Sequence, residues 1–207
     1  MPFTFPLSKD PIDAGFNLFS GKDIHLKPGV TVLVGCNGYG KTTFLQMLRQ
    51  RLNQENIPFV SFDNLSEGGA HAREKAGYYG DYKFLATSLC SSEGENISMN
   101  LGTTMRDIAR AQMANKAATK FFILMDAVDS GLSIDNIVDL QEMFPVIMEH
   151  HPNAAAEVYI IVSANTYEMV RDCEQCLDVH SGKYRSFKSY DDYCVFIHET
   201  RRIKDLR

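Results

Sequence analysis

The chain has 207 residues, 44% hydrophobic and 23% charged, which is typical of a globular domain, and we expect one domain over residues 1–207. The formal net charge of −5 gives nucleic acid no overall electrostatic attraction, so the charge does not support a nucleic-acid partner. No apolar run is long enough to cross a bilayer and no secretory signal is evident, so we expect a soluble, cytoplasmic protein without a membrane partner.

The first third of the chain predicts strands followed by a helix. Residues 3–29 contain short apolar pieces separated by prolines and glycines, which indicates an antiparallel edge. The apolar run 31–34 (TVLV) predicts a buried strand that stops at Gly35. Residues 42–52 carry apolar side chains at helical spacing, which predicts a helix with one buried face.

A glycine-rich segment joins this strand to this helix. Residues 35–43 read GCNGYGKTT and fit the P-loop pattern G-x-x-x-x-G-K-[ST]. The pattern predicts a cradle in which backbone N–H groups and Lys41 bind the phosphates of ATP, while the hydroxyl of Thr42 binds Mg²⁺. The residues expected to bind the nucleotide are Gly35, Asn37, Gly38, Tyr39, Gly40, Lys41, Thr42 and Thr43.

The rest of the chain alternates between apolar runs and helical patterns. Helical spacing over residues 97–118 and 134–148 predicts helices, with a small helical lobe at roughly residues 66–118. The alternation predicts an α/β fold with a largely parallel sheet flanked by helices. The runs that predict buried strands are residues 58–62, 121–125 and 158–162.

Asp126 directly follows one of these strands. A carboxylate at this position holds the metal in P-loop proteins, so we expect Thr42 and Asp126 to bind Mg²⁺. Further on, residues 176–187 predict a hairpin. The basic cluster near the end of the chain is interpreted as a solvated helix end, where cations are favourable. Its members are Arg201, Arg202, Lys204 and Arg207.

Three segments carry a family resemblance. Residues 126–133 (DAVDSGLS) resemble the Walker B and D-loop stretch of ABC-type ATPases, including SMC, RecF and OLD-like heads. Residues 91–95 (SSEGE) resemble a degenerate signature motif of that family, and residues 158–165 resemble the strand that leads to its switch histidine. The segments occur in the family's order, and the resemblance implies a minimal head without a coiled coil.

The resemblance implies that two heads bind ATP between them. An ATP-dependent homodimer, or pairing with another head, would bring the signature residues to the nucleotide of the opposite subunit. Such heads act as clamps or switches, in DNA maintenance among other processes. The residues implied are Ser92, Gly94 and Glu95 for the signature, and Ser130 and Gly131 for the D-loop.

At two positions that act in hydrolysis, the residue differs from the one that the family usually has. Ala127 stands where a glutamate activates water, and Asn165 stands in place of the switch histidine. Slow hydrolysis, replacement of the glutamate by Asp129 or Glu95, and an engineered alanine all remain open. The candidate catalytic residues are Lys41, Asp126, Asp129 and Asn165.

Two other functions compete with an ATPase head. A non-hydrolysing ATP sensor is favoured by the same two departures. A P-loop kinase acting on a small molecule would require arginines in a lid over the phosphates, and no such pattern is evident.

Overall fold

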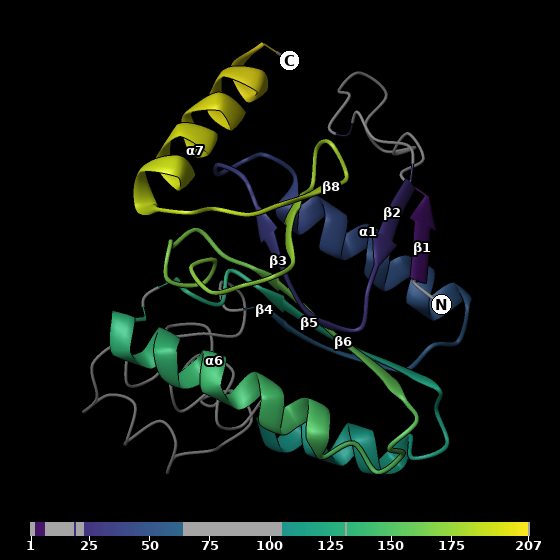
Figure 1. Ribbon diagram of the computed structural model, residues 1–207. Coiled ribbons are helices and arrows are strands. Elements are labelled where there is room, and N and C mark those ends of the chain that lie inside the picture. The colour runs from purple at the N-terminus through teal and green to yellow at the C-terminus, as the bar shows by residue number, and fades with distance from the viewer. Residues whose placement is uncertain (1–2, 7–18, 20–22, 64–104, 131, 207) are drawn as a thin grey trace, which may run out of the picture.

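A computed structural model describes residues 3–6, 19, 23–63, 105–130 and 132–206. A six-stranded sheet forms the centre, and helices cover both of its faces (Figure 1). Residues 105–114 are helical as well. The other elements in chain order are β1 (Phe3–Pro6), β2 (Asp23–Leu26), β3 (Gly29–Val34), α1 (Lys41–Gln54), β4 (Phe59–Asp63), β5 (Lys120–Asp126), α6 (Ile134–Glu149), β6 (Glu157–Ser163), β7 (Cys176–Asp178), β8 (Lys183–Arg185) and α7 (Tyr190–Asp205).

The main sheet has the strand order β4-β5-β6-β3-β7-β8, and every neighbouring pair except β7 and β8 is parallel. This confirms the predicted α/β fold with a largely parallel sheet. β6 lies between β3 and β5 and is parallel to both, so the carboxyl ends of these three strands lie side by side at one end of the sheet. Val34, Asp126 and Ser163 therefore end their strands in the same region, where loops can form a ligand site.

The buried strands divide their side chains between two cores, as β5 illustrates. Phe121, Ile123 and Met125 face the core beneath α6, residues 105–114 and α7. The intervening Phe122 and Leu124 face the core beneath α1 and the β1–β2 pair. Side chains alternate between the faces of a strand, so a continuous apolar run is the expected pattern when both faces are covered.

The N-terminal strands confirm the predicted antiparallel edge. β1 and β2 pair antiparallel and form a two-stranded sheet of their own beside the main sheet. Phe3 and Phe5 are buried, and their rings lie 5.0 Å from that of Phe122 and 5.3 Å from that of Phe44, respectively. One face of this small sheet thus covers the α1 side of the core.

The helices begin and end close to the predicted positions. α1 extends the predicted helix 42–52 by one residue at its start and two at its end, and α6 begins at Ile134, as predicted. Of the proposed lobe at 66–118, residues 66–104 lie outside the described part of the chain. Among the helices that are described, none is long and apolar enough to cross a membrane.

Candidate functional site

The loop between β3 and α1 has a backbone that requires glycine. Gly35, Gly38 and Gly40 have φ angles of 138°, 76° and 109°, in the region that side chains disfavour. A Cβ atom at Gly35 would stand 2.1 Å from Cδ1 of Tyr39, whose ring is buried. The loop thus curls around the Tyr39 ring, which packs in the α1-side core.

A cavity of about 200 Å³ opens at this loop. It is bounded by the loop, the first turn of α1 and the ends of β5 and β6. α1 begins after Gly40 without a side-chain cap, so its first N–H groups have no intrahelical partner and suit an anion. The lining residues are Asn37, Gly38, Gly40, Lys41, Thr42, Thr43, Asp126, Ala127, Ser163 and Asn165.

Lys41 is a buried cation within this cavity, with a side chain that is only slightly exposed. Its ammonium group donates to the carbonyl oxygens of Gly35 at 2.6 Å and Cys36 at 3.3 Å, and to Oδ1 of Asn165 at 3.0 Å. Burial lowers the pKa of Lys41, while Cys36, Asp129 and Asp126 act in the opposite direction. Neutral oxygens thus satisfy a charge that an anionic ligand would satisfy better.

Thr42 and Asp126 line the same cavity, as a shared metal site requires. The Ser163 hydroxyl donates to Oδ1 of Asp126 and accepts the N–H of Ala127 at 2.9 Å. Ser163 therefore fixes the orientation of the carboxylate. A hydroxyl and a carboxylate are suitable oxygen ligands for Mg²⁺.

This pair alone would leave a metal ion incompletely coordinated. Within the described ranges, no group of three or more His, Cys, Asp or Glu side chains is placed to hold a metal ion. Mg²⁺ prefers six oxygen ligands and usually keeps several waters. The residues present therefore fit a Mg²⁺ ion that also binds phosphate oxygens and water.

Ala127 brings only a methyl group to the cavity lining. Its φ angle is 49°, which is unusual for a residue other than glycine. The backbone therefore turns sharply directly after Asp126. Neither the methyl group nor the backbone at this position can accept a proton from water.

Asp129 lies outside the cavity lining and is buried. Its Oδ2 atom accepts the backbone N–H groups of Asn165 and Thr166, both at 2.7 Å. On the other side, the Tyr193 hydroxyl donates to the carbonyl of Asn165 at 2.9 Å. The backbone of Asn165 is thus held by two side chains, while its amide group contacts Lys41.

The structure brings together most of the predicted site residues that it describes. Asn37, Lys41, Thr42, Asp126 and Asn165 share one cavity. Ser130, from the predicted D-loop, is exposed just after the end of β5. Four predicted residues lie outside the described part of the chain, namely Ser92, Gly94, Glu95 and Gly131.

The sequence interpretation missed the contribution of α7. The N–H of Cys36 donates to Oγ1 of Thr200 at 3.1 Å, and Lys204 donates to the carbonyl of Asn37 at 3.3 Å. Lys204 lies in the last turn of α7, as the interpretation of the basic cluster as a helix end expects, and it contacts the loop in addition. The Cys36–Thr200 contact joins residues 164 positions apart, so no local pattern could have indicated it.

Comparison with known proteins gives a partial match. The cytochrome c biogenesis ATP-binding export protein CcmA of Rhizobium johnstonii is 32% identical to this chain over 118 residues. The match covers 56% of this chain and 50% of the relative, so the chain spans about half the length of the curated relative that it matches. No protein-family model matches the chain. The relative is an ATP-binding protein by name, which supports nucleotide binding by a fold of this kind.

Proposed function

We propose that this chain binds Mg·ATP and acts as a nucleotide-driven switch of the ABC type. The observation that carries the proposal is that Lys41, Thr42 and Asp126 line one cavity at a glycine-rich loop. The similarity to an ATP-binding export protein supports the same ligand. The similarity covers only half of that protein, so we do not assign its export function to this chain.

The chain's own groups would bind the triphosphate in a defined way. Lys41 exchanges its contacts with carbonyl and amide oxygens for phosphate oxygens, which are stronger acceptors because they are charged. The free N–H groups at the start of α1 bind the same anion. Bound Mg²⁺ would neutralise phosphate charge, held by Thr42 and by Asp126, which Ser163 keeps in place.

We propose that hydrolysis is slow because Asp126, which would bind Mg²⁺, is the only carboxylate among the described residues that line the cavity. Ala127 lacks a carboxylate, and Asp129, whose Oδ2 atom accepts two backbone N–H groups, lies outside the cavity lining. Asp129 is thus a positioning residue for Asn165. Asn165 can donate to a phosphate oxygen but cannot carry a proton at neutral pH. Bound ATP would therefore persist, as a switch requires.

Head-to-tail pairing is the further part of the proposal, and it is based on the family resemblance. Of the D-loop residues implied in pairing, Ser130 is exposed, and its N–H donates to the carbonyl of Ala127 at 3.0 Å. A residue so placed would be covered by a second head bound across the nucleotide. ATP binding would then favour the dimer, and loss of the terminal phosphate would release it.

Sedimentation velocity combined with phosphate-release assays tests this function. The wild-type chain should form dimers with Mg·ATP but not with Mg·ADP, and release phosphate slowly. Thr42→Ala should dimerise only at higher Mg²⁺ concentration, whereas Gln46→Ala, an exposed change on the same helix, should behave as wild type. A wild-type chain that stays monomeric while it binds ATP would refute pairing, and the protein would then be an ATP sensor.

A further inference from the structure

A second cavity lies beside the phosphate cavity. Its volume is about 440 Å³, and it shares Asn37 and Asn165 with the first. The loop residues Gly35 and Cys36 form one wall, and α7 forms the other with Ile197, Arg201 and Lys204. Among the described residues, the lining thus contains two cationic side chains and no carboxylate, in a chain whose net charge is −5. Such a cavity favours an anionic ligand.

The α7 wall is fixed directly to the P-loop. Thr200 accepts the N–H of Cys36, and Lys204 donates to the carbonyl of Asn37 at 3.3 Å. The aliphatic stem of Lys204 packs close to Gly38, where Cδ would lie 3.5 Å from an added Cβ atom. α7 contributes a hydroxyl to one contact and an ammonium group to the other, so its end is held against the loop that would bind phosphates.

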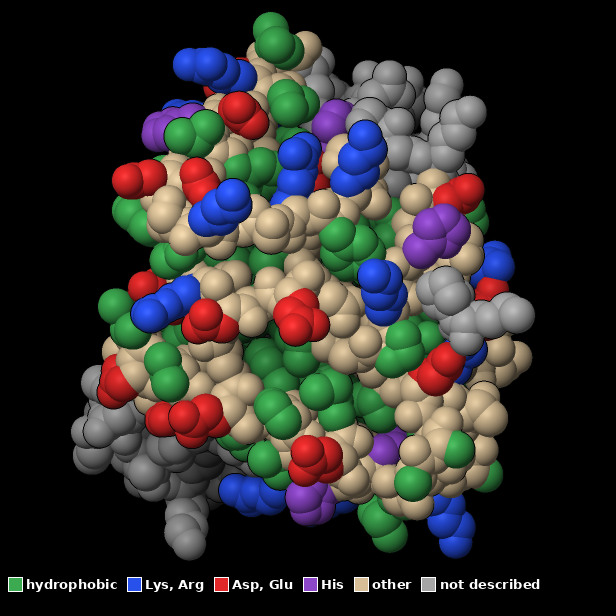
Figure 2. Space-filling model, in the orientation of Figure 1, with side chains coloured by type: hydrophobic (Ala, Val, Ile, Leu, Met, Phe, Trp, Pro, Cys, Tyr) green, Lys and Arg blue, Asp and Glu red, His purple; other side chains and the backbone are tan. Residues whose placement is uncertain are grey.

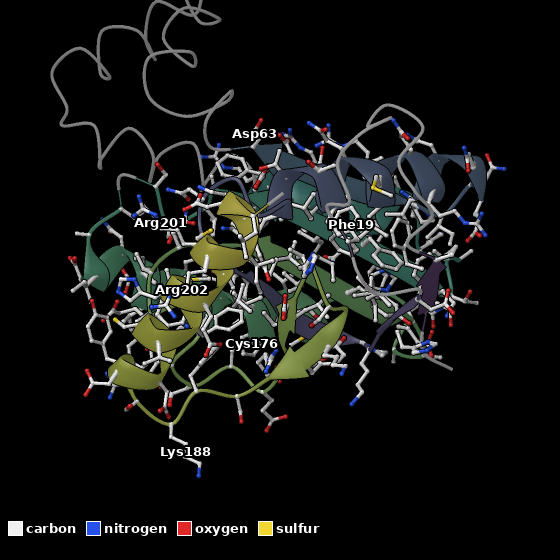
Figure 3. All side chains as sticks on the ribbon, turned by 90° about the horizontal axis from the view of Figure 1, so that it is seen from above. Phe19, Asp63, Cys176, Lys188, Arg201 and Arg202 are labelled. Atoms are coloured by element: carbon white, nitrogen blue, oxygen red, sulfur yellow. The ribbon has the colours of Figure 1, made fainter. Side chains whose placement is uncertain are left out.

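Within the described part of the chain, neither cation has a strong ion pair. Lys204 lies 3.8 Å from Oδ1 of Asp205, and both side chains are more than one third exposed. Arg201 takes part in none of the salt bridges found in the described ranges, and it is exposed. Figure 3 shows Arg201 and Arg202 on α7. Arg202 is absent from the cavity lining, which makes it a matched control.

We propose that Arg201 and Lys204 bind the terminal phosphate of a nucleoside triphosphate and so distinguish it from a diphosphate. This inference rests on the proposed function, because it requires a nucleotide in the adjoining cavity. Asn37 and Asn165 border both cavities, so an anionic group at the end of a bound triphosphate can reach the cations from the P-loop side. Lys204 would exchange the neutral carbonyl of Asn37 for a charged oxygen, which is the stronger acceptor.

The proposal gives α7 a role as the element that responds to the bound nucleotide. With a triphosphate, both cations are drawn toward the loop; with a diphosphate, only the contact of Lys204 with Asn37 remains. The sequence from Tyr190 to Asp205 forms a single helix whose Tyr193 also contacts Asn165. The presence of the terminal phosphate would therefore change the contacts at both ends of α7.

Calorimetric titration with Mg·ATP and Mg·ADP tests the inference directly. Arg201→Gln and Lys204→Gln should each weaken ATP binding by about tenfold or more, since each removes a charge-assisted contact to phosphate. Affinity for ADP should stay within about twofold of wild type. Arg202→Gln, which removes the same charge from the next position of α7, should alter neither affinity.

Two results would overturn the inference while leaving nucleotide binding intact. One is an equal loss of ATP and ADP affinity in the glutamine variants, and the other is no loss for either nucleotide. Arg201→Lys should keep most of the ATP preference, so a loss as large as that of Arg201→Gln would contradict a role based on charge. A wild-type chain that bound neither nucleotide would refute the proposed function itself. The unfolding temperature of the nucleotide-free Arg201→Gln variant should match wild type, because this side chain is exposed. That of Lys204→Gln should fall slightly, because this variant loses the contact with the Asn37 carbonyl.

Discussion

Lys41 and Asn165 are joined by a hydrogen bond of 3.0 Å from the ammonium group to the amide oxygen. The contact connects the P-loop with the residue that follows β6, and it lies within the proposed phosphate site. Asn165 is held in turn by Asp129 through its N–H and by Tyr193 through its carbonyl. A change in the Lys41 environment is therefore transmitted to the β5 and α7 sides of the site.

The contact predicts a strong effect of charge at position 165. Asn165→Asp places a carboxylate beside the buried ammonium, which should raise the pKa of Lys41 and repel the phosphates. We expect Mg·ATP affinity to fall by at least about tenfold, measured by calorimetry. Asn165→Ala removes the contact without adding charge and should have a smaller effect. An aspartate variant that binds ATP as tightly as wild type would place the phosphates elsewhere.

The role of Asp129 can be separated from that of a catalytic base. Asp129→Ala leaves the partly buried N–H groups of Asn165 and Thr166 without their acceptor, so we expect a loss of about 1–3 kcal/mol in the free energy of unfolding. Urea denaturation measures this loss. A general base would behave in the opposite way, with unchanged stability and a loss of phosphate release alone.

Position 127 should control the rate of hydrolysis. Ala127→Glu introduces a general base at the edge of the cavity and should raise phosphate release by about 100-fold, at the lower end of the range for such catalysis. Ala127→Gln has nearly the same shape without the basic group and should remain slow. If the glutamate variant binds Mg·ATP yet releases phosphate no faster, another group limits hydrolysis.

Gly35 should be far less tolerant of substitution than Gly38. An added Cβ at Gly35 meets the buried Tyr39 ring at 2.1 Å, whereas at Gly38 the nearest atom is Cδ of Lys204 at 3.5 Å. Gly35→Ala should therefore cost about 2–4 kcal/mol of stability, from overpacking plus backbone strain. Gly38→Ala should cost about 1 kcal/mol, from its positive φ alone. Equal losses in urea denaturation would contradict the packing seen around Tyr39.

The sequence was sufficient to predict the sheet and the P-loop because their signals are local. The run at 121–125 is apolar throughout because its alternate residues face two covered sides of the sheet. The glycines of residues 35–43 are required by the positive φ angles within that same segment. Ser163 and α7 were missed as parts of the site for a different reason. Their contacts with Asp126, Cys36 and Asn37 depend on how distant segments pack, which no periodicity indicates.

One apolar surface lies outside the proposed nucleotide site. A groove of about 590 Å³ lies between α6 and the segment before β7, lined by side chains such as Val138, Pro145, Met148 and Cys173. Figure 2 shows hydrophobic side chains gathered in the central part of this face, above α6. The groove is separate from the P-loop cavity, since the two share no lining residue.

Calorimetric titration of the wild-type chain and of Lys41→Ala with Mg·ATP measures whether Lys41 binds the phosphates. We expect saturable binding by the wild-type chain and a loss of at least about 100-fold, or 2.7 kcal/mol, in the variant, because the buried ammonium is the main charge facing the phosphates. Arg49→Ala, an exposed change on α1, should bind as wild type does. Absence of binding by the wild-type chain, or unchanged affinity in Lys41→Ala, would contradict the assignment of this cavity as a triphosphate site.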